Sequence, residues 1–225
     1  MKRFLAAVVA VTTALALTAC GSSSTNTTTD DKSAESTDDT TYKIGVLQLT
    51  QHAALDKANE GFIAALDESG IKYEVDQQNA SGEQSACQTI AEKLVNDGND
   101  LIYAIATPAA QAVAGVTSEI PIVLSAVTDP AESGLVASND APGGNVTGTS
   151  DLTPVKEQIE LLKQILPDAK TVGILFCSSE SNSEIQAAMA REACEANGLE
   201  HIDFTVSSSN EIQTVVESMV GKVDV

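Results

Sequence analysis

The sequence predicts an α/β fold built from two doubly wound lobes, each with a parallel sheet, the second of them incomplete. Three observations lead to this prediction. Between residues 42 and 130, short apolar runs alternate with segments of helical periodicity. The runs at 101–106 and 121–127 show no alternation, as is typical of parallel strands covered on both faces. The same signals start again near residue 172. Since crossovers between parallel strands are right-handed, this order favours a doubly wound sheet.

The predicted N-terminal lobe comprises residues 42–150. In the central helix, Thr107 is suited to be the N-cap and Pro108 fits the first helical position. Gly70 is placed for the left-handed residue that ends a helix. We interpret the glycines from 144 to 148 as backbone flexibility at the junction between the lobes. The expected elements are strands at 42–49, 73–77, 101–106, 121–127 and 146–152. The expected helices are one from about 55 that ends at Ser69-Gly70, one that opens from residues 79–83 and runs to about 96, and one that begins at Pro108.

The predicted second lobe, residues 151–225, repeats the start of the first. Gly173 corresponds to Gly45 and Gly198 to Gly70, at the same spacing. A helix at 154–166 precedes this copy, and its polar loop at 177–183 is expected to face the cleft from the opposite side. Residues 221–225 correspond to the point where the first lobe is about to form its third strand. We therefore expect a C-terminally truncated sequence whose second lobe continues in the complete protein.

The N-terminus has the features of a targeting segment. Residues 1–19 combine a positive start with an apolar stretch of signal-peptide length, and Leu17-Thr18-Ala19-Cys20 resembles the bacterial lipobox. Cys20 is then a lipid attachment point; the alternative is a plain secretory signal with a chance cysteine. Residues 20–41 are rich in Ser, Thr and Asp and have no apolar periodicity, so the lipidated Cys and a disordered tether are expected there. The predicted location is extracytoplasmic, anchored to the cell membrane only by the lipid.

Composition excludes several functions. With 12 basic and 32 acidic residues the net charge is −20, and no basic cluster offers a surface for nucleic acid. Cys87, Cys177 and Cys194 show no zinc-ligand spacing, so no metal or other cofactor is expected. His52 and Asp56 are spaced to share a helix face, but no suitably placed nucleophile accompanies them. The sequence therefore does not predict an enzyme.

Candidate binding residues follow two adjacent predicted strands. In an open parallel sheet, ligands bind at the carboxyl ends of the strands, which places Thr107, Thr128 and Asp129 at one cleft. The helix that starts there offers free backbone N–H groups for a carboxylate, and Asp129 offers a partner for an ammonium group. This pairing is the pattern of an amino-acid receptor. The alternative is that Thr107 only caps its helix and Asp129 only opens a turn before Pro130.

Beyond these segments, the sequence resembles a known family over residues 43–225. It is similar to ABC-transporter substrate-binding lipoproteins of the tryptophan/tyrosine-binding type, which have the type I periplasmic-binding-protein fold. The resemblance implies a bilobal receptor that closes on a small-molecule ligand, an aromatic amino acid, and delivers it to ABC permease subunits. The motifs that carry it are IGVLQLTQHAALD, QNASGEQS, DLIYAIATPAAQA, IPIVLSAVTDP, GGNVTGTSDLTPVKEQIELLKQILP and SSESNS.

The resemblance also implies a set of ligand-facing positions. The chain departs from the family in having Ala53 after His52, where the family usually has proline, and in lacking the later Asp- and Thr-rich motifs. Two alternatives stay open: a ligand-sensing or adhesive surface lipoprotein of the same fold, and a binding protein for a sugar or nucleoside. The implied positions are Gln48, His52, Thr107, Pro108, Thr128, Asp129, Ser150, Asp151, Ser179, Glu180, Asn182 and Ser183.

Overall fold

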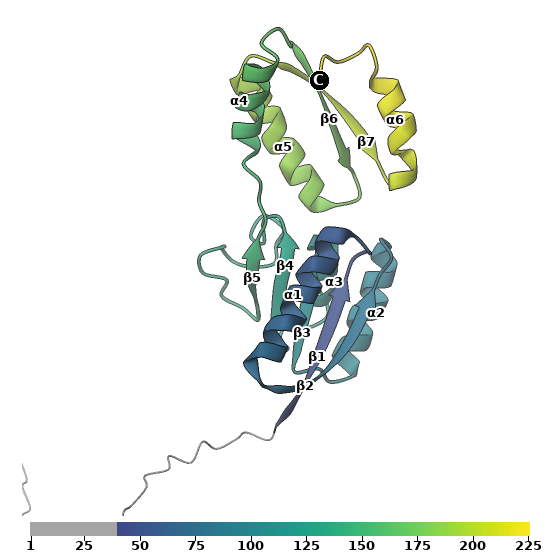
Figure 1. Cartoon of the computed structure of the whole chain (residues 1–225), viewed down its shortest axis with the longest axis vertical. Helices are drawn as coiled ribbons and strands as arrows, with labels where there is room; N and C mark the ends of the chain where they lie inside the picture. Colours follow the sequence, from purple (N-terminus) through teal and green to yellow (C-terminus); the bar gives the residue numbers. More distant parts are fainter. Residues whose placement is uncertain (1–39) are drawn as a thin grey trace, which may run out of the picture. The chain divides into compact units, whose positions relative to one another are not determined.

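The structure, a computed structural model, describes residues 40–225 (Figure 1). The predicted signal segment, Cys20 and nearly all of the predicted tether lie outside the described residues. Residues 40–225 belong to one compact unit. Its regular elements are β1 Thr41–Gln48, α1 Ala53–Ser69, β2 Lys72–Asn79, α2 Gln84–Asn96, β3 Leu101–Ile105, α3 Thr107–Ala114, β4 Ile122–Val127, β5 Val146–Ser150, α4 Val155–Ile165, β6 Thr171–Cys177, α5 Ser181–Ala196, β7 Glu200–Val206, the 3-10 turn η1 Ser209–Glu211 and α6 Ile212–Met219.

The first sheet has five strands in the order β2-β1-β3-β4-β5, all parallel. From β1 the chain first adds β2 on one side and then crosses back to add β3 on the other side of β1. This reversal of direction confirms the doubly wound arrangement. As predicted, Gly70 ends α1 in the left-handed conformation, with φ of 72°. The strand expected at 146–152 is β5, and it completes this sheet at the edge next to β4.

Helices cover both faces of the five-stranded sheet (Figure 1). On one face α1 packs against Val46 and Ile105, which are fully buried, and Phe62 stacks on Tyr103 with ring centroids 4.0 Å apart. On the other face α2 and α3 share a larger apolar cluster with Leu47. Burying a side chain of this size contributes about 1.5–3 kcal/mol to stability. Burial on both faces of the sheet thus explains why the apolar runs at 101–106 and 121–127 do not alternate with polar residues.

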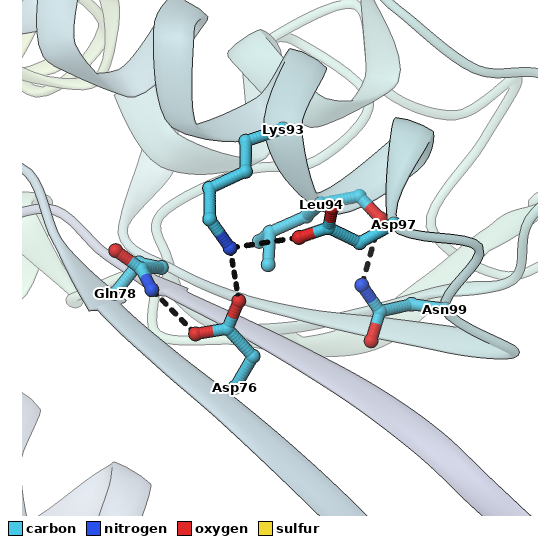
Figure 2. Close-up of polar contacts among 6 residues, drawn as sticks. All are labelled: Asp76, Gln78, Lys93, Leu94, Asp97 and Asn99. Atoms are coloured by element: carbon cyan, nitrogen blue, oxygen red, sulfur yellow. Dashed lines mark hydrogen bonds and ion pairs between the residues drawn. The ribbon is translucent and has the colours of Figure 1, made fainter.

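A polar network fixes the end of α2 against the sheet (Figure 2). Lys93 binds Asp76 on β2 and Asp97 at the helix end, and Asp76 also accepts a hydrogen bond from Gln78. Just beyond the helix, buried Asn99 donates to the carbonyl oxygen of Leu94 at 2.7 Å. Because that carbonyl is one of the last in the helix, the Asn99 amide provides the partner that the helix cannot supply.

The second sheet consists of β6 and β7, which pair in parallel from Thr171 to Cys177. Helices α4 and α5 pack over it with an apolar cluster that includes Ile159, Val172 and Cys194. Helix α6 follows β7 and has no buried residue. Its Ile212 and Val216 are 42% and 44% exposed, so an apolar side of this helix faces solvent in residues 40–225.

The two sheets begin with the same local construction. Ahead of β3, Asp100 accepts a hydrogen bond from the Lys43 amide at 2.8 Å, at the start of β1. In the second sheet, Asp224 accepts from the amides of Lys170 and Thr171 at 2.8 and 3.0 Å, at the start of β6. The repeat found in the sequence is therefore also a repeat of hydrogen bonding.

Two local predictions were wrong. Helix α3 begins at Thr107, one residue early, with Ala106 as its N-cap and no side-chain cap, so Thr107 does not act as the N-cap and Pro108 is the second helical residue. Gly148 does not provide flexibility between lobes. It lies in β5, where an added Cβ would approach the Leu124 carbonyl oxygen to 2.4 Å, so the close contact between β4 and β5 requires glycine.

Candidate functional site

Within residues 40–225, three non-glycine residues have positive φ, and each lies near the carboxyl end of a strand of the first sheet. Ser81 follows β2 with φ of 55°, Ala106 follows β3 with 83°, and Ala126 lies in β4 with 54°. Such conformations cost of order 1–3 kcal/mol each, and they cluster where binding sites need a particular backbone path. The strain therefore marks the same end of the sheet that the sequence indicated.

The N-terminus of α3 carries the most isolated polar group at this end. The Thr107 side chain is 1% exposed, and its Oγ1 has no hydrogen-bond partner among the described residues. A buried hydroxyl without a partner costs about 1–3 kcal/mol. Ala106, directly before it, has ψ of 151° and supplies no side-chain cap, which leaves N–H groups of the first turn open. Pro108 beside it is buried.

Asp129 organises the turn after β4. Its Oδ1 accepts from the amides of Ala131 and Glu132, both at 3.1 Å, and from the side-chain amide of Asn139 at 2.9 Å. The Asn139 hydrogen bond, together with those two backbone amides, lowers the pKa of Asp129. The turn-opening role considered for Asp129 is thus present, and every hydrogen bond that residues 40–225 make to its carboxylate ends on Oδ1. Neighbouring Thr128 is 5% exposed, and its carbonyl oxygen accepts from Ser150 Oγ at 2.6 Å.

The loop after β1 has a polar hollow of its own. Gln48 is 4% exposed and donates through Nε2 to the Thr50 carbonyl oxygen and to Asp56 Oδ1, both at 2.7 Å. These residues belong to the wall of a hollow of about 620 Å³. His52 is exposed and accepts from the Ala54 amide at 3.2 Å, so it caps α1. The wall of this hollow is formed by Gln48, Thr50, Gln51, Asp56, Asn59, Gln77, Gln78, Asn79 and Ser81. His52, although close in sequence to Gln48, is not part of it.

A second hollow, of about 720 Å³, joins loops of the two sheets. Of the predicted residues, Ser179 and Glu180 line it. Leu49 and Thr50 come from the predicted ligand-facing loop after β1, and Cys177, at the end of β6, begins the polar loop expected to face the cleft. The segments after β2 and at the end of β7 supply the rest, including strained Ser81. The residues that the sequence did not indicate are Ser81, Gly82, Glu83, Gln84, Ser85, Val206, Ser207, Ser208, Ser209, Asn210 and Ile212.

The predicted loop at 177–183 is partly helical. Helix α5 begins at Ser181 with Glu180 as its N-cap, so Asn182 and Ser183 belong to the first turn and not to the loop. Asn182 Oδ1 is buried without a hydrogen-bond partner among the described residues. The Ser183 amide donates to the Glu180 carbonyl oxygen at 3.2 Å, a helix-start bond. Asp151 is exposed just after β5.

The predicted residues therefore fall into separate groups. Thr107 and Pro108 are buried at one strand end, Thr128, Asp129 and Ser150 surround the next turn, Gln48 lines the smaller hollow, and Ser179 with Glu180 lines the larger one. The rule that ligands bind at the carboxyl ends of parallel strands, which selected Thr107 and Asp129, would also have found the missed residues. It applies to the ends of β2 and β7 as well.

Metal ligands are not assembled in the described part of the chain. Residues 40–225 contain no group of three or more His, Cys, Asp or Glu side chains able to hold an ion. Cys87 and Cys194 are buried free thiols, and burial raises the pKa of both. Cys177 is a partly exposed free thiol that lines the larger hollow. In the same region no helix is long and apolar enough to cross a membrane.

The family model for "ABC transporter substrate binding protein" matches residues 43–225 of this chain. The chain belongs to this family. These substrate-binding proteins are solute-binding proteins and not enzymes, which agrees with the absence of a catalytic set predicted from the sequence. The resemblance to the family and the predicted type I periplasmic-binding-protein fold are both confirmed.

Three relatives place the protein more closely within the substrate-binding family. A tyrosine-binding protein from Clostridioides difficile (strain R20291) is 44% identical over 196 residues, covering 85% of this chain and 57% of that protein. A Streptococcus pneumonia domain solved in complex with L-Trp is 43% identical, with a TM-score of 0.78 over 82% of this chain and 64% of the other. The ligand-free, open structure of a Clostridium difficile substrate-binding protein with adhesive properties is 42% identical, with a TM-score of 0.59 over 81% and 63%. The chain thus spans less than two thirds of each relative.

Proposed function

We propose that this protein is the solute-binding component of an ABC importer and binds an aromatic amino acid between two lobes, residues 42–150 and 151–225. The protein acts outside the cytoplasm. Residues 1–19 direct export, Cys20 carries the lipid anchor, and residues up to 41 tether the receptor to the membrane. Its partners are the ligand and the permease subunits. Family membership supports the transport role, and the tyrosine- and L-Trp-binding relatives support an amino acid over a sugar or nucleoside.

The observation that carries this proposal is the start of α3. Thr107 Oγ1 is buried without a partner, and the turn that follows has no side-chain cap. A carboxylate at this position accepts hydrogen bonds from the hydroxyl and from free backbone N–H groups, and it interacts favourably with the positive end of the helix dipole. Ligand binding then satisfies groups that the folded protein leaves open, which favours the bound state.

Asp129 is the proposed partner of the ligand's ammonium group. Its Oδ1 is occupied by the turn, whereas Oδ2 receives no hydrogen bond from residues 40–225. The lowered pKa keeps the carboxylate charged over the whole neutral range. A charged hydrogen bond to an ammonium group contributes more than a neutral one, about 1.5–3 kcal/mol.

The composition of the chain makes the binding test direct. Because the protein contains no tryptophan, added L-tryptophan is the only indole whose emission changes on binding. We expect a saturable change in L-tryptophan fluorescence with the full-length protein, reversed by L-tyrosine and unaffected by glucose or adenosine. Calorimetry provides the stoichiometry. If neither L-tryptophan, L-tyrosine nor L-phenylalanine gives heat or displacement, the proposed ligand class is wrong.

Two substitutions separate the turn role of Asp129 from its role toward the ligand. Asp129→Asn keeps an Oδ1 acceptor for the turn but removes the charge, whereas Asp129→Ala removes both. We expect Asp129→Asn to melt close to wild type and to bind at least tenfold more weakly, because about 1.4 kcal/mol corresponds to that factor. Asp129→Ala should lose affinity and also stability. Wild-type affinity in Asp129→Asn would leave the residue a turn former only. Asn139→Ala is the control, since it weakens the turn without removing the charge.

A further inference from the structure

Gln111 on α3 makes contacts that a surface helix residue does not need. Its Nε2 donates to the Ser133 carbonyl oxygen and to Ser181 Oγ, both at 3.1 Å. Ser181 Oγ also lies 3.4 Å from Gln111 Oε1, in reach to donate back. Ser133 belongs to the turn opened by Asp129, and Ser181 is the first residue of α5. One side chain therefore connects α3, the Asp129 turn and the second lobe.

The position of Gln111 relative to the proposed site explains the importance of this connection. Gln111 lies four residues after Thr107, which places both on the same side of α3. The three elements that it joins are those to which the ligand contacts are assigned. The sequence analysis did not select Gln111, because glutamine within a helix is ordinary and its partners are 22 and 70 residues away.

Another side-chain hydrogen bond joins the first lobe to the loop that precedes α5. Gln84 Nε2 donates to the Ser179 carbonyl oxygen at 2.6 Å. Among the described residues, Gln84 makes no hydrogen bond to the Asp129 turn. Gln111 is thus the side chain that connects a proposed ligand-binding turn with the opposite lobe.

The comparison structures differ in how well they match this arrangement. At nearly equal identity, 43% and 42%, the chain superposes on the L-Trp complex with a TM-score of 0.78 and on the ligand-free, open structure with 0.59. The hydrogen bonds of Gln111 therefore occur in an arrangement nearer to that of the complex.

From these contacts we propose that Gln111 is a positioning residue that couples closure of the lobes to occupation of the binding site. This inference rests on the proposed function. A ligand held at Thr107 and Asp129 orders α3 and the turn, which places the Gln111 amide where it binds the first turn of α5. Conversely, the bond to Ser181 stabilises the closed form and slows release of the ligand. The ligand contacts and the hydrogen bond between Gln111 and Ser181 both favour the closed form, so the presence of either one increases the population of that form.

The test compares Gln111→Ala, Ser181→Ala and their double variant in the full-length protein. Gln88→Ala is the matched control. Gln88 is a glutamine on a first-lobe helix, and among the described residues its side chain hydrogen-bonds only to Glu92 of the same helix, at 2.8 Å. The readouts are L-tryptophan affinity and dissociation rate from its fluorescence, and the radius of gyration by small-angle X-ray scattering with and without L-tryptophan. The melting temperature is recorded for each variant.

We expect Gln111→Ala to weaken L-tryptophan binding about three- to tenfold, the range for losing one or two neutral hydrogen bonds, mainly through faster dissociation. Ser181→Ala should reproduce most of this loss of affinity. The double variant should bind no more weakly than Gln111→Ala, because both substitutions remove the same hydrogen bond between Gln111 and Ser181. Gln88→Ala should bind as wild type. In small-angle X-ray scattering, Gln111→Ala should have a larger radius of gyration than wild type, because its lobes are more open.

Two results would overturn the coupling role. One is wild-type affinity in Gln111→Ala; the other is a loss of affinity with a lower melting temperature but an unchanged radius of gyration, as expected of a purely structural residue. If wild-type protein binds no aromatic amino acid, the proposed function fails while the coupling role is still tested. A more open ligand-free Gln111→Ala then supports the role, and an identical radius of gyration contradicts it.

Discussion

The starts of the two sheets are built alike but are packed differently. In both, a glycine in the first strand lies under a helix, and an aspartate after that helix accepts backbone amides from the strand's beginning. In the first sheet the neighbours of Gly45 are Leu94 and Asn99, both buried. In the second, Gly173 lies under Met219 and Val223, which are partly exposed.

This difference shows what the repeated sequence signals specify. Glycine and aspartate at matching positions fix the local path of the chain in both sheets. The depth of packing depends instead on what covers the helix. Helix α2 buries Cys87, Ala91 and Leu94 against the sheet and α3, whereas α6 buries none of its residues in the described chain. Equal local signals thus give unequal tertiary environments.

The largest expected difference between the two sheets comes from replacing Gly45 and Gly173 with alanine, which adds one methyl group at each position. In Gly45→Ala, the new Cβ meets Leu94 Cδ2 at 3.1 Å and the hydrogen-bonded Asn99 amide at 3.2 Å. Overpacking a buried site of this kind costs about 1–3 kcal/mol. In Gly173→Ala, the nearest atom, at 2.6 Å, is the terminal methyl of Met219, a flexible side chain that can turn aside. We expect a cost below about 1 kcal/mol there, measured by urea unfolding.

A paired control checks that the difference comes from packing. Gly61→Ala places its methyl group in open space on α1, where nothing lies within 4 Å, and should leave stability unchanged or raise it by up to about 1 kcal/mol. Equal losses in Gly45→Ala and Gly173→Ala, or a greater loss at Gly173, would show that the two sites are packed alike.

A smaller effect concerns the aspartate of the second sheet. Hydrogen bonds from the amides of Lys170 and Thr171 lower the pKa of Asp224. Because the folded-state pKa is depressed, this contribution is present above the unfolded pKa of about 3.9 and is lost as the pH falls through the folded value. We expect the Thr171 amide resonance to shift with a midpoint below the ordinary aspartate value in an NMR titration.

Asp224→Asn provides the control for that titration, since it keeps the size of the side chain and removes its ionisation. The shift of the Thr171 resonance should disappear, and the stability difference from wild type, present at neutral pH, should vanish in acid. A midpoint at or above the ordinary aspartate value would contradict the hydrogen bonding described for Asp224.

Much of the fold was predictable because its signals are local. Apolar runs without alternation identified β3 and β4, helical spacing identified α1 and α2, and Gly70 marked the end of a helix. The α3 start was missed by one residue because a Thr-Pro pair is the usual start signal, whereas here the strained Ala106 takes the N-cap position. Gly148 was misinterpreted because the sequence does not show that Leu124 lies against it.

The candidate site was only partly predictable. Thr107 and Asp129 were selected as candidates because they follow strands. The structure adds that the Thr107 hydroxyl has no partner among the described residues and that one carboxylate oxygen of Asp129 is used by a turn. The hollow joining the two sheets and the contacts of Gln111 were not predictable, because they unite residues far apart in the chain. No local pattern encodes the partner of a helix glutamine.

By itself, the sequence determined the order of strands and helices, the repeat of the two starts and the family of the protein, since periodicity, glycine positions and motifs are properties of neighbouring residues. Only the tertiary structure decided which polar groups stay unsatisfied, which oxygen of Asp129 is occupied and which side chains cross between the lobes. The physical reason is that burial and hydrogen bonding depend on the atoms that folding brings together from distant positions.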